Sequence, residues 1–380
     1  MSIILVDDNK VNLFVLEKIL KSVNYPEAIF LQSAHELYDY LHIFDQAASA
    51  QSVDLILLDI MMPEIDGIEA CKKIRQDDRY KNTQIIFTTA LDDKKKLAEA
   101  LAAGGNDYVT KPINRTELIA RIDVALRLKK ELDWHAQHEK NIEAELKLAT
   151  QVQRSLLSKP VEDEKIRIQV NYEPTSNLAG DMYYWNKIDD HRYAVMLFDM
   201  MGHGIPAALV CMYISSVLRE SVDTIVEPTE VMQELNRYMT LLHNDLEKVP
   251  YYFTAIYMLI DMKEKTIQYV NAGHPSGYAC LDGEQLEKLE HNSCAIGFFA
   301  DAPMKAHTIS YKESVQIIGF TDGVLEAMHE DEIVAESRMA ELAKQHWASP
   351  KALLNDAIPP NHPSQKDDMC VMLVSIDNKQ

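Results

Sequence analysis

The sequence predicts a multidomain protein that joins an α/β doubly wound domain, a helical linker and an α+β sandwich. Three observations support this fold class. Short apolar runs alternate with helical patterns over residues 1–125, as in a parallel sheet covered by helices on both faces. Residues 126–160 are mostly a charged stretch without Gly or Pro until Pro160. Over residues 161–380, strand patterns follow one another with few helices between, which favours an antiparallel sandwich flanked by helices.

The composition limits the classes of partner. The chain has 380 residues, enough for two or three domains with an ample core. Its 38 Lys and Arg against 59 Asp and Glu give a net charge of −21, which disfavours nucleic acid and anionic membrane as partners. The 5 cysteines form no C-x-x-C pair, so neither disulfides nor zinc are implied.

The N-terminus predicts no targeting segment. Its apolar run, Ile3–Val6, is too short for a signal peptide and follows no basic region. No stretch of the sequence approaches the length that we expect of a membrane-spanning helix. These features predict a cytoplasmic protein in a reducing compartment.

In the first domain, residues 1–125, apolar runs of strand length are Ile3–Val6, Leu55–Leu58, Ile85–Phe87 and Tyr108–Val109. Helical patterns between them cover Val11–Ser22, Ala34–Ala47, Gly67–Arg75, Lys94–Ala103 and Arg115–Leu128. The carboxyl ends of the strands in such a sheet meet at one edge, where ligands bind. We therefore expect Asp7, Asp8, Asp59, Thr89 and Lys111 to lie together.

The residue types at this edge predict a phosphoryl-transfer site. Closely spaced carboxylates repel one another, and a hard cation such as Mg²⁺ removes the repulsion and prefers oxygen ligands. Asp59 can then act as a nucleophile toward a phosphoryl donor while Lys111 and the metal neutralise the transferring oxygens. Each residue alone could equally cap a turn or form a surface ion pair.

Residues 1–125 resemble a response-regulator receiver domain, which has a flavodoxin-like fold, along their whole length. The matching motifs are the acid pair Asp7–Asp8, LLDIMMPEIDG around Asp59, TTA at Thr89 and YVTKP at Lys111. The resemblance implies that Asp59 accepts a phosphoryl group from a cognate histidine kinase.

The same resemblance implies the supporting roles in this domain. Asp8, Asp59 and the Met61 carbonyl would hold Mg²⁺, with Asp7 in support. Thr89 and Tyr108 would be the switch residues that respond to the phosphoryl group.

The linker, residues 126–160, leaves two interpretations open. Heptads counted from Ala125 place Ala125, Leu132, Glu139, Leu146 and Gln153 at a, and Leu128, His135, Ile142, Ala149 and Leu156 at d. This seam is interrupted by His135 and Glu139. One interpretation is a parallel coiled coil that joins two subunits into a homodimer and is weak enough for phosphorylation to shift it. The other is a single helix that lies against its own domains.

In the second domain, residues 161–380, the predicted strands are Ile166–Tyr172, Tyr193–Phe198, Thr254–Ile260, Thr266–Asn271, Val315–Phe320 and Cys370–Ile376. The longer helical patterns are Pro206–Val222 and Thr229–Leu246. Asp181, Asp199, Asp322 and Asp367 stand at strand ends or turns. Each has a Gly or a second acid within a few residues, which lets the backbone approach a ligand closely.

These four aspartates predict a metal-dependent hydrolase. The sequence offers no His/Cys spacing for zinc, and oxygen-only ligands favour Mg²⁺ or Mn²⁺. Two such ions about 3.5–4 Å apart can activate water at neutral pH and hold both oxygens of an in-line phosphoryl displacement. We expect the four carboxylates to converge around two ions.

Residues 145–380 resemble the metal-dependent, type-2C protein phosphatases, specifically their SpoIIE/RsbU-type bacterial branch. The matching motifs are AGD, DMMGHGIPAA, FTAIYMLID, YVNAGHPSG, AIG, TDGVLEA and DDMCVMLV, preceded by the lead-in LATQVQRSLLSKP. The resemblance implies that Asp199 bridges both metals, that Asp181 and the Met200 carbonyl complete one site, and that Asp322 and Asp367 complete the other. Residues that depart from the family pattern are Ser158, Ala179, Tyr184 and Cys370, and none of these changes removes a ligand.

Several assignments stay open at this point. His203 either anchors its turn by hydrogen bonds or protonates the leaving serine oxygen. Asp368 is expected to support a ligand, and Asn271 and His274 to pack a turn near the rim. The run Met182–Trp185 is interpreted as core or rim packing.

The sequence as a whole predicts a response regulator whose output is a protein phosphoserine/phosphothreonine phosphatase. The resemblance implies a small phosphoprotein substrate, typically an anti-sigma-factor antagonist with a STAS fold. The alternative is a catalytically inactive scaffold that binds and sequesters its partner. The sequence leaves open whether phosphorylation of Asp59 activates the output or relieves an inhibition.

Overall fold

The structure is a computed structural model of the whole chain, in which residues 2–23, 25, 28–45, 47, 49, 51–90, 94–245, 251–329, 331–358 and 367–377 are described. The chain divides into two compact units, residues 1–143 and 144–380. The division falls inside one long helix, α5 (Arg115–Ser155). The predicted linker therefore belongs in part to each unit.

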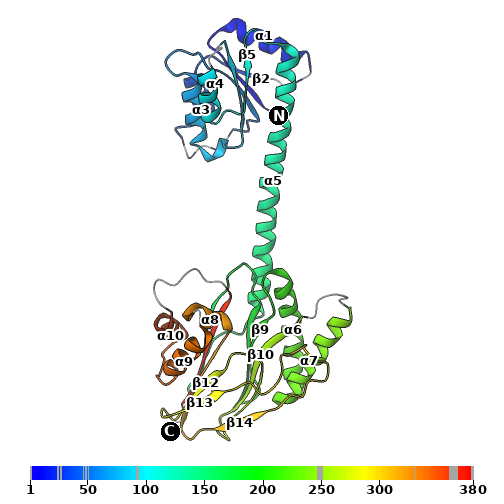
Figure 1. Cartoon of the computed structure of the whole chain (residues 1–380), viewed down its shortest axis with the longest axis vertical. Coiled ribbons are helices and arrows are strands. Elements are labelled where there is room, and N and C mark those ends of the chain that lie inside the picture. The colour runs from blue at the N-terminus through cyan, green and yellow to red at the C-terminus, as the bar shows by residue number, and fades with distance from the viewer. Residues whose placement is uncertain are drawn as a thin grey trace. The chain divides into compact units, whose positions relative to one another are not determined.

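The first unit contains a parallel five-stranded sheet in the order β2-β1-β3-β4-β5 (Figure 1). Its strands are β1 (Ile3–Val6), β2 (Ala28–Leu31), β3 (Leu55–Asp59), β4 (Gln84–Thr89) and β5 (Asp107–Thr110). Its helices are α1 (Lys10–Lys21), α2 (Ala34–Leu41), α3 (Gly67–Arg75), the short 3-10 helix η1 (Asp78–Tyr80), α4 (Lys94–Ala102) and the first part of α5.

Two separate cores confirm the doubly wound arrangement. One face of the sheet packs against apolar side chains of α2, α3 and α4, and the other face against α1 and α5. Strand β2 was missed by the sequence analysis. Helix α2 is shorter than predicted, because His42 takes a left-handed conformation with φ of 52° and ends it at Leu41.

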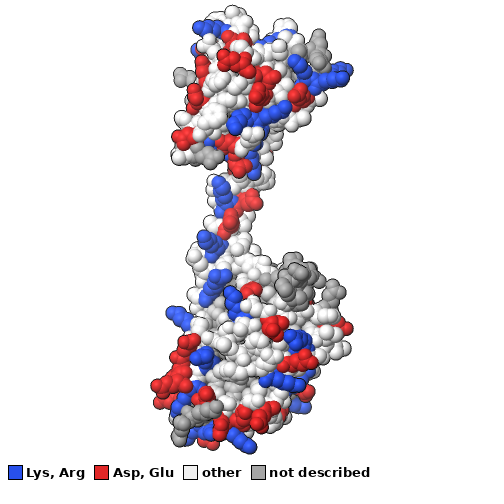
Figure 2. All heavy atoms as spheres, turned by 90° about the vertical axis from the view of Figure 1, so that its left-hand side faces the viewer, with Lys and Arg blue, Asp and Glu red and all other residues white. Residues whose placement is uncertain are grey.

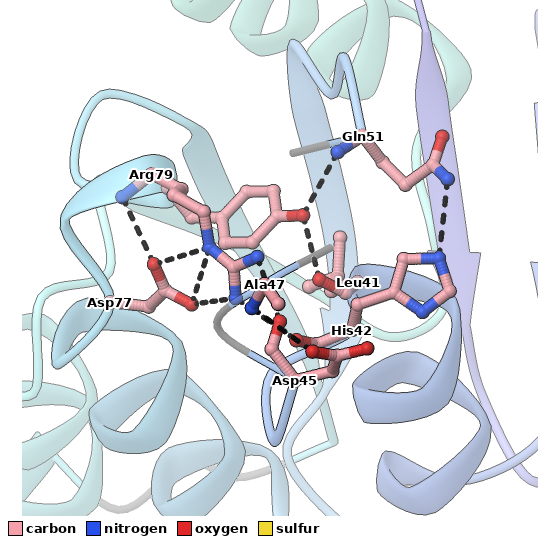
Figure 3. Close-up of polar contacts among 8 residues, drawn as sticks. Leu41, His42, Asp45, Ala47, Gln51, Asp77 and Arg79 are labelled. Atoms are coloured by element: carbon pink, nitrogen blue, oxygen red, sulfur yellow. Dashed lines mark hydrogen bonds and ion pairs between the residues drawn. The ribbon is translucent and has the colours of Figure 1, made fainter. Parts of the chain in front are cut away.

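A polar cluster fixes the segment that follows α2 (Figure 3). Arg79 donates to both carboxylate oxygens of Asp77 and to the carbonyls of His42 and Asp45. The hydroxyl of Tyr80 donates to the Leu41 carbonyl at 2.7 Å. The end of α2 is thereby tied to the loop that leads into β4.

The second unit contains two antiparallel sheets, in the orders β14-β11-β10-β9-β8 and β13-β12-β15-β16-β7-β6. The first is built from β8 (Asp181–Lys187), β9 (Arg192–Met200), β10 (Phe253–Asp261), β11 (Thr266–Ala272) and β14 (His307–Ser310). The second is built from β6 (Val161–Glu162), β7 (Ile166–Glu173), β12 (Gly277–Leu281), β13 (Gln285–Leu289), β15 (Ser314–Phe320) and β16 (Met369–Asp377). The helices are α6 (Ile205–Thr224), α7 (Pro228–Asp245), α8 (Asp322–Met328), α9 (Glu332–Leu342) and α10 (Pro350–Ala357).

Three cores hold these layers together and confirm the predicted sandwich. The inner faces of the two sheets pack on each other. Helices α6 and α7 cover the outer face of the first sheet, and α8, α9 and α10 cover the outer face of the second (Figure 1). On the face seen in Figure 2, acidic and basic side chains are interspersed in each unit.

The expectation that no stretch is long enough to cross a membrane is wrong for α6. Its 20 residues have a mean hydropathy of 1.3 and pass that test by length and composition alone. Half of this helix is buried within the second unit, where it packs on the sheet. A core helix needs an apolar composition for the same reason, so this is weak evidence for a membrane span.

Candidate metal centres

The first candidate centre lies at the carboxyl ends of β1, β3 and β5. Asp7 and Asp59 are buried, and the Nζ of Lys111 lies 2.8 Å from Asp7 Oδ2 and 2.9 Å from Asp59 Oδ2. Asp7 also accepts hydrogen bonds from the side chain of Asn12 at 2.9 and 3.1 Å. The parallel sheet therefore brings these residues together as the sequence analysis expected.

The donor set of this centre fits a hard divalent cation. Asp7, Asp8 and Asp59 each offer a carboxylate oxygen, and these oxygens lie within 4.8 Å of one another. Burial raises the pKa of Asp59, and the nearby Lys111 ammonium lowers it. Asp59 Oδ1 is buried with no well-formed hydrogen bond, although the Met61 N–H is close enough to lower the pKa. A cation bound here would neutralise acids that one lysine only partly balances.

The remaining residues predicted for this centre surround it. Thr89 is buried at the end of β4, and Tyr108 is half-buried on β5 beneath the Arg121 guanidinium. Met61 is exposed on the loop after β3. Gly67 begins α3 so close to β3 that an added Cβ would lie 2.1 Å from the Asp59 carbonyl oxygen, so only glycine fits.

The second candidate centre lies where the two sheets of the second unit meet. Asp181, the first residue of β8, pairs with Asp199 near the end of β9. Asp322 is the first residue of α8, one residue after the end of β15, and Asp367 stands two residues before β16. Four aspartates that are far apart in the sequence thus come from two sheets to one edge of the sandwich.

The electrostatics show that these carboxylates are close neighbours. Burial raises the pKa of Asp199 to about 8, and Asp322 and Asp367 add to the increase. The pKa of Asp181 is raised well above its usual range, first by burial and then by Asp199. Burial also raises the pKa of Asp367, with a contribution from Asp322. The described residues around this cluster bring too little positive charge to prevent these shifts, so the site fits divalent cations.

The ligand oxygens of these four acids are spread more widely than those of the first centre. No three of the four have ligand oxygens that all lie within 4.8 Å of one another, unlike the three acids of the first centre. Asp199 is the common neighbour, since it pairs with Asp181 across the strands and the charges of Asp322 and Asp367 raise its pKa.

The turn after Asp199 is closely fixed. The N–H of Met200 donates to the Gly180 carbonyl at 3.1 Å, and the Cys211 thiol donates to the same carbonyl at 2.8 Å. Gly202 and Gly204 have φ of 83° and 80°, which few other residues adopt. Helix α6 begins directly after this turn, with Pro206 in its first turn.

Thr321 is a residue of this site that sequence reasoning missed. Its hydroxyl donates to Asp181 Oδ2 at 2.7 Å and accepts the N–H of Cys370 at 3.0 Å. It therefore orients one acid while joining β15 to β16. The sequence signal was its place beside Asp322 in the TDG motif.

The side chain of Asp368 is occupied by hydrogen bonds to other parts of the second unit. Its Oδ1 accepts from the N–H and the hydroxyl of Thr175 at 2.7 and 2.9 Å, and its Oδ2 accepts the Gly180 N–H at 2.8 Å. The side chain is buried. It holds the loop before Asp181 against the start of β16.

The two histidines near the site, His203 and His274, differ in their exposure to solvent. His203 is exposed on the turn, and its charge lowers the pKa of Asp367. His274 is buried, and burial lowers its pKa to about 3. Its Nδ1 lies 2.9 Å from the hydroxyl of Thr254, which pairs with Asp199 in the sheet. The Asn271 side chain accepts the His274 N–H at 2.9 Å and so fixes the turn that carries it.

Two family models match the chain. Residues 3–123 match the response regulator receiver domain. Residues 189–377 match the family described as Stage II sporulation protein E (SpoIIE). The matched ranges contain the first centre entirely and all of the second except Asp181.

Individual relatives agree with these families. The phosphoserine phosphatase RsbP of Bacillus subtilis is 34% identical over 246 residues, covering 63% of this chain and 60% of RsbP. The transcriptional regulatory protein SpaR of Bacillus subtilis is 37% identical over 126 residues, 33% of this chain and 51% of SpaR. The chain thus spans less than two thirds of either relative.

A solved structure shows the same fold for the second unit. The SiaA-PP2C domain of Pseudomonas aeruginosa aligns with a TM-score of 0.51 and 19% identity, covering 64% of this chain and 100% of that domain. At this identity the likeness concerns the fold alone.

Proposed function

We propose that this chain, in which a response-regulator receiver domain precedes a SpoIIE-type PP2C phosphatase domain, is a phosphorylation-controlled protein phosphatase. Its substrate would be a protein phosphoserine or phosphothreonine. The observation that carries the proposal is the convergence of Asp181, Asp199, Asp322 and Asp367 at one edge of the sandwich, with the pKa raised for Asp199, Asp181 and Asp367. Asp181 is buried and the other three carboxylates are partly buried. Neighbouring carboxylates withdrawn from water are costly, and bound cations would offset this cost.

The residues of the second centre have distinct roles in this proposal. Asp199 would be the shared ligand, Asp181 and the Met200 carbonyl would complete one site, and Asp322 and Asp367 the other. Two Mg²⁺ or Mn²⁺ ions, when bound, would activate water and neutralise the phosphoryl oxygens. Exposed His203, whose charge lowers the pKa of Asp367, would either anchor the turn by hydrogen bonds or give a proton to the departing serine oxygen.

The receiver domain would control this output. Asp59 accepts the phosphoryl group of a cognate histidine kinase in this proposal, and Asp7, Asp8 and the Met61 carbonyl help it to hold Mg²⁺. The Lys111 ammonium, already 2.9 Å from Asp59, would balance the added charge. Thr89 and Tyr108 would then respond as switch residues.

Helix α5 is the proposed route to a homodimer. Leu128 and Ile142 occupy heptad positions of α5, and both are exposed. Such exposure is expected of positions that pack against the helix of a second subunit. The last two seam positions do not serve this purpose, because Gln153 is buried against the second unit and Leu156 packs on its core. The coiled coil would therefore be confined to the part before residue 150.

The relatives suggest the setting and the substrate. RsbP is named a phosphoserine phosphatase, and so is RsbU of Bacillus subtilis, which is 26% identical over 213 residues. A phosphorylated anti-sigma-factor antagonist with a STAS fold, in a bacterial partner-switching pathway of the cytoplasm, is the proposed substrate.

Phosphorylation of the receiver domain would shift the phosphatase from a mostly inactive to a mostly active state. A shift of this size takes about 5.5 kcal/mol of preference for the active state.

The test is phosphate release from a serine-phosphorylated STAS-domain protein with Mn²⁺, compared with Asp199→Asn. An inactive scaffold would release no more phosphate than that variant. Comparing the activity with and without a small phosphodonor, for wild type and for Asp59→Ala, would give the sign of the control.

A further inference from the structure

Several large apolar side chains of the second unit are exposed beside the second metal centre. Phe298 and Phe299, on the loop between β13 and β14, are 58% and 56% exposed. Ile205 and Leu209 are 50% and 57% exposed. They lie four residues apart in α6 and therefore share one face of the helix. Exposed apolar groups that gather in one place mark interaction surfaces more often than scattered ones do.

The phenylalanine loop is held in place. The buried side chain of Asn236, from α7, accepts the Gly297 N–H at 2.8 Å and donates to the carbonyls of Phe299 and Ala300 at 2.9 Å each. The Phe298 ring packs edge-on against both Phe299 and Tyr252. We call Tyr252, Phe298 and Phe299 the aromatic ridge. A surface ordered before binding loses less conformational entropy when a partner arrives.

We call residues 201–204, the turn that follows Asp199, the metal turn. It connects the aromatic ridge to the face of α6 that carries Ile205 and Leu209. The N–H of Met201 donates to the Tyr252 carbonyl at 3.0 Å, at the start of this turn. Its end, Gly204, leads directly into Ile205. The ridge and the helix face therefore both adjoin the turn that follows Asp199.

Charge alone gives this site little affinity for one particular phosphoprotein. Four carboxylates would balance the charge of two divalent ions, and the chain carries a net charge of −21. Selection of a substrate must then come from contacts beside the phosphate, and the large side chains exposed there include the apolar Phe298, Phe299, Ile205 and Leu209. Aromatic side chains are the usual anchors of such contacts.

We propose that the aromatic ridge, together with Ile205 and Leu209, is the docking surface for the folded phosphoprotein substrate. The partner presents an apolar patch next to its phosphoserine, so that the phosphate enters the metal centre while the patch covers the ridge. This inference rests on the proposed phosphatase activity. It adds that recognition depends on a folded surface and not on the phosphoserine alone.

The test compares a folded and a small substrate. The variants are Phe299→Ser and Leu209→Ser, and the control is Ile333→Ser on α9, where Ile333 is 77% exposed. The folded probe is a serine-phosphorylated STAS-domain protein, and the small probe is para-nitrophenyl phosphate. We expect kcat/KM for the folded probe to fall about tenfold or more in each ridge or helix-face variant. With the small probe, and in the control variant, it should stay within about twofold, as expected where no apolar contact is lost.

Other outcomes overturn the inference. An equal fall with both probes would show that these residues merely support the metal turn. An unchanged kcat/KM with a loss of self-association in sedimentation would show that a second copy of the chain covers the surface. Circular dichroism checks that each variant folds, and Phe298→Ser replaces any that does not. If wild type hydrolyses neither probe with Mn²⁺, the phosphatase proposal itself fails.

Discussion

The side chain of Gln153 and the backbone of Ala179 form a reciprocal pair of hydrogen bonds. Gln153 Nε2 donates to the Ala179 carbonyl at 2.7 Å, and the Ala179 N–H donates to Gln153 Oε1 at 3.1 Å. Both groups are buried. The last turns of α5 therefore hold the loop that leads into Asp181, two residues later.

Replacing Gln153 should weaken the metal centre without touching a ligand. Gln153→Leu leaves a buried N–H and a buried carbonyl without partners, at about 1–3 kcal/mol each. We expect a higher Mn²⁺ concentration for half-maximal activity and a lower urea midpoint for the second unit. The control is Val152→Leu, next to it on α5 but half exposed. Equal Mn²⁺ dependence in Gln153→Leu and wild type would show that this contact only supports the fold.

The stability of the metal-free protein should decrease as pH rises. The raised pKa of Asp199, about 8, means that the folded state keeps a proton which the unfolded state releases near pH 4. Between these values the folded state binds more protons, so the free energy of unfolding falls with increasing pH, by a few kcal/mol in order of magnitude. Chelated protein should therefore melt at lower temperature at pH 8 than at pH 5.

Asp199→Asn checks the origin of that slope. The variant removes the titrating group, so its melting temperature in chelator should depend less on pH, while its phosphatase activity with Mn²⁺ should fall roughly 10³-fold. Adding Mn²⁺ should raise the melting temperature of wild type most at pH 8, where the carboxylates are ionised. A wild-type protein whose stability in chelator rose from pH 5 to pH 8 would contradict the clustering of these acids.

Thr321 should matter through the orientation of Asp181. Thr321→Val keeps the volume but removes the hydroxyl that joins Asp181 to the Cys370 N–H. We expect roughly tenfold weaker activation by Mn²⁺, as is typical when a group that orients a ligand is lost. Thr321→Ser should restore most of it. A serine variant as impaired as the valine variant would show that loss of the hydroxyl does not by itself account for the effect.

Gly323 should tolerate no side chain. An added Cβ would lie 2.1 Å from the Asp368 carbonyl oxygen, so Gly323→Ala must move α8 or the segment that carries Asp367. We expect a loss of activity with a clear loss of stability. Gly319→Ala is the matched control, because its Cβ would meet side chains only at 3.4 Å and 3.5 Å, an ordinary contact distance. Similar effects of the two substitutions would indicate general intolerance of the sheet.

Much of the fold followed from periodicity. The predicted bounds of β1 and α3 agree with the structure, because β1 is a short apolar run followed by acids and α3 begins after the N-cap Asp66 and ends on basic residues. Strand β2, which was missed, has four residues that are only half-buried or exposed. Strand β8 begins on an aspartate of the second candidate centre, and its aromatic run does not alternate with polar residues, so it was interpreted only as packing.

The site was less completely predictable than the fold. Motifs identified the acids, since their neighbours in the sequence are distinctive. Thr321 and Gln153 act through contacts with residues far away in the chain. The TDG motif marks the position of Thr321 but not its partner, and no local pattern marks the contact of Gln153. Heptad counting placed Gln153 in a coiled-coil seam, whereas its amide pairs with a backbone in its own unit.

The remaining seam residues allow a test of the homodimer. Leu128 and Ile142 are 44% and 43% exposed on α5, and both occupy heptad position d. If two copies of α5 pack through this seam, Leu128→Ser with Ile142→Ser buries hydroxyls in the interface, and sedimentation equilibrium should show a shift toward monomer. Leu148→Ser is the matched control, because Leu148 is 63% exposed but lies off the seam. A monomer produced by the control alone would place the contact on another face of the helix, and wild type that is already monomeric with and without a phosphodonor would refute the dimer.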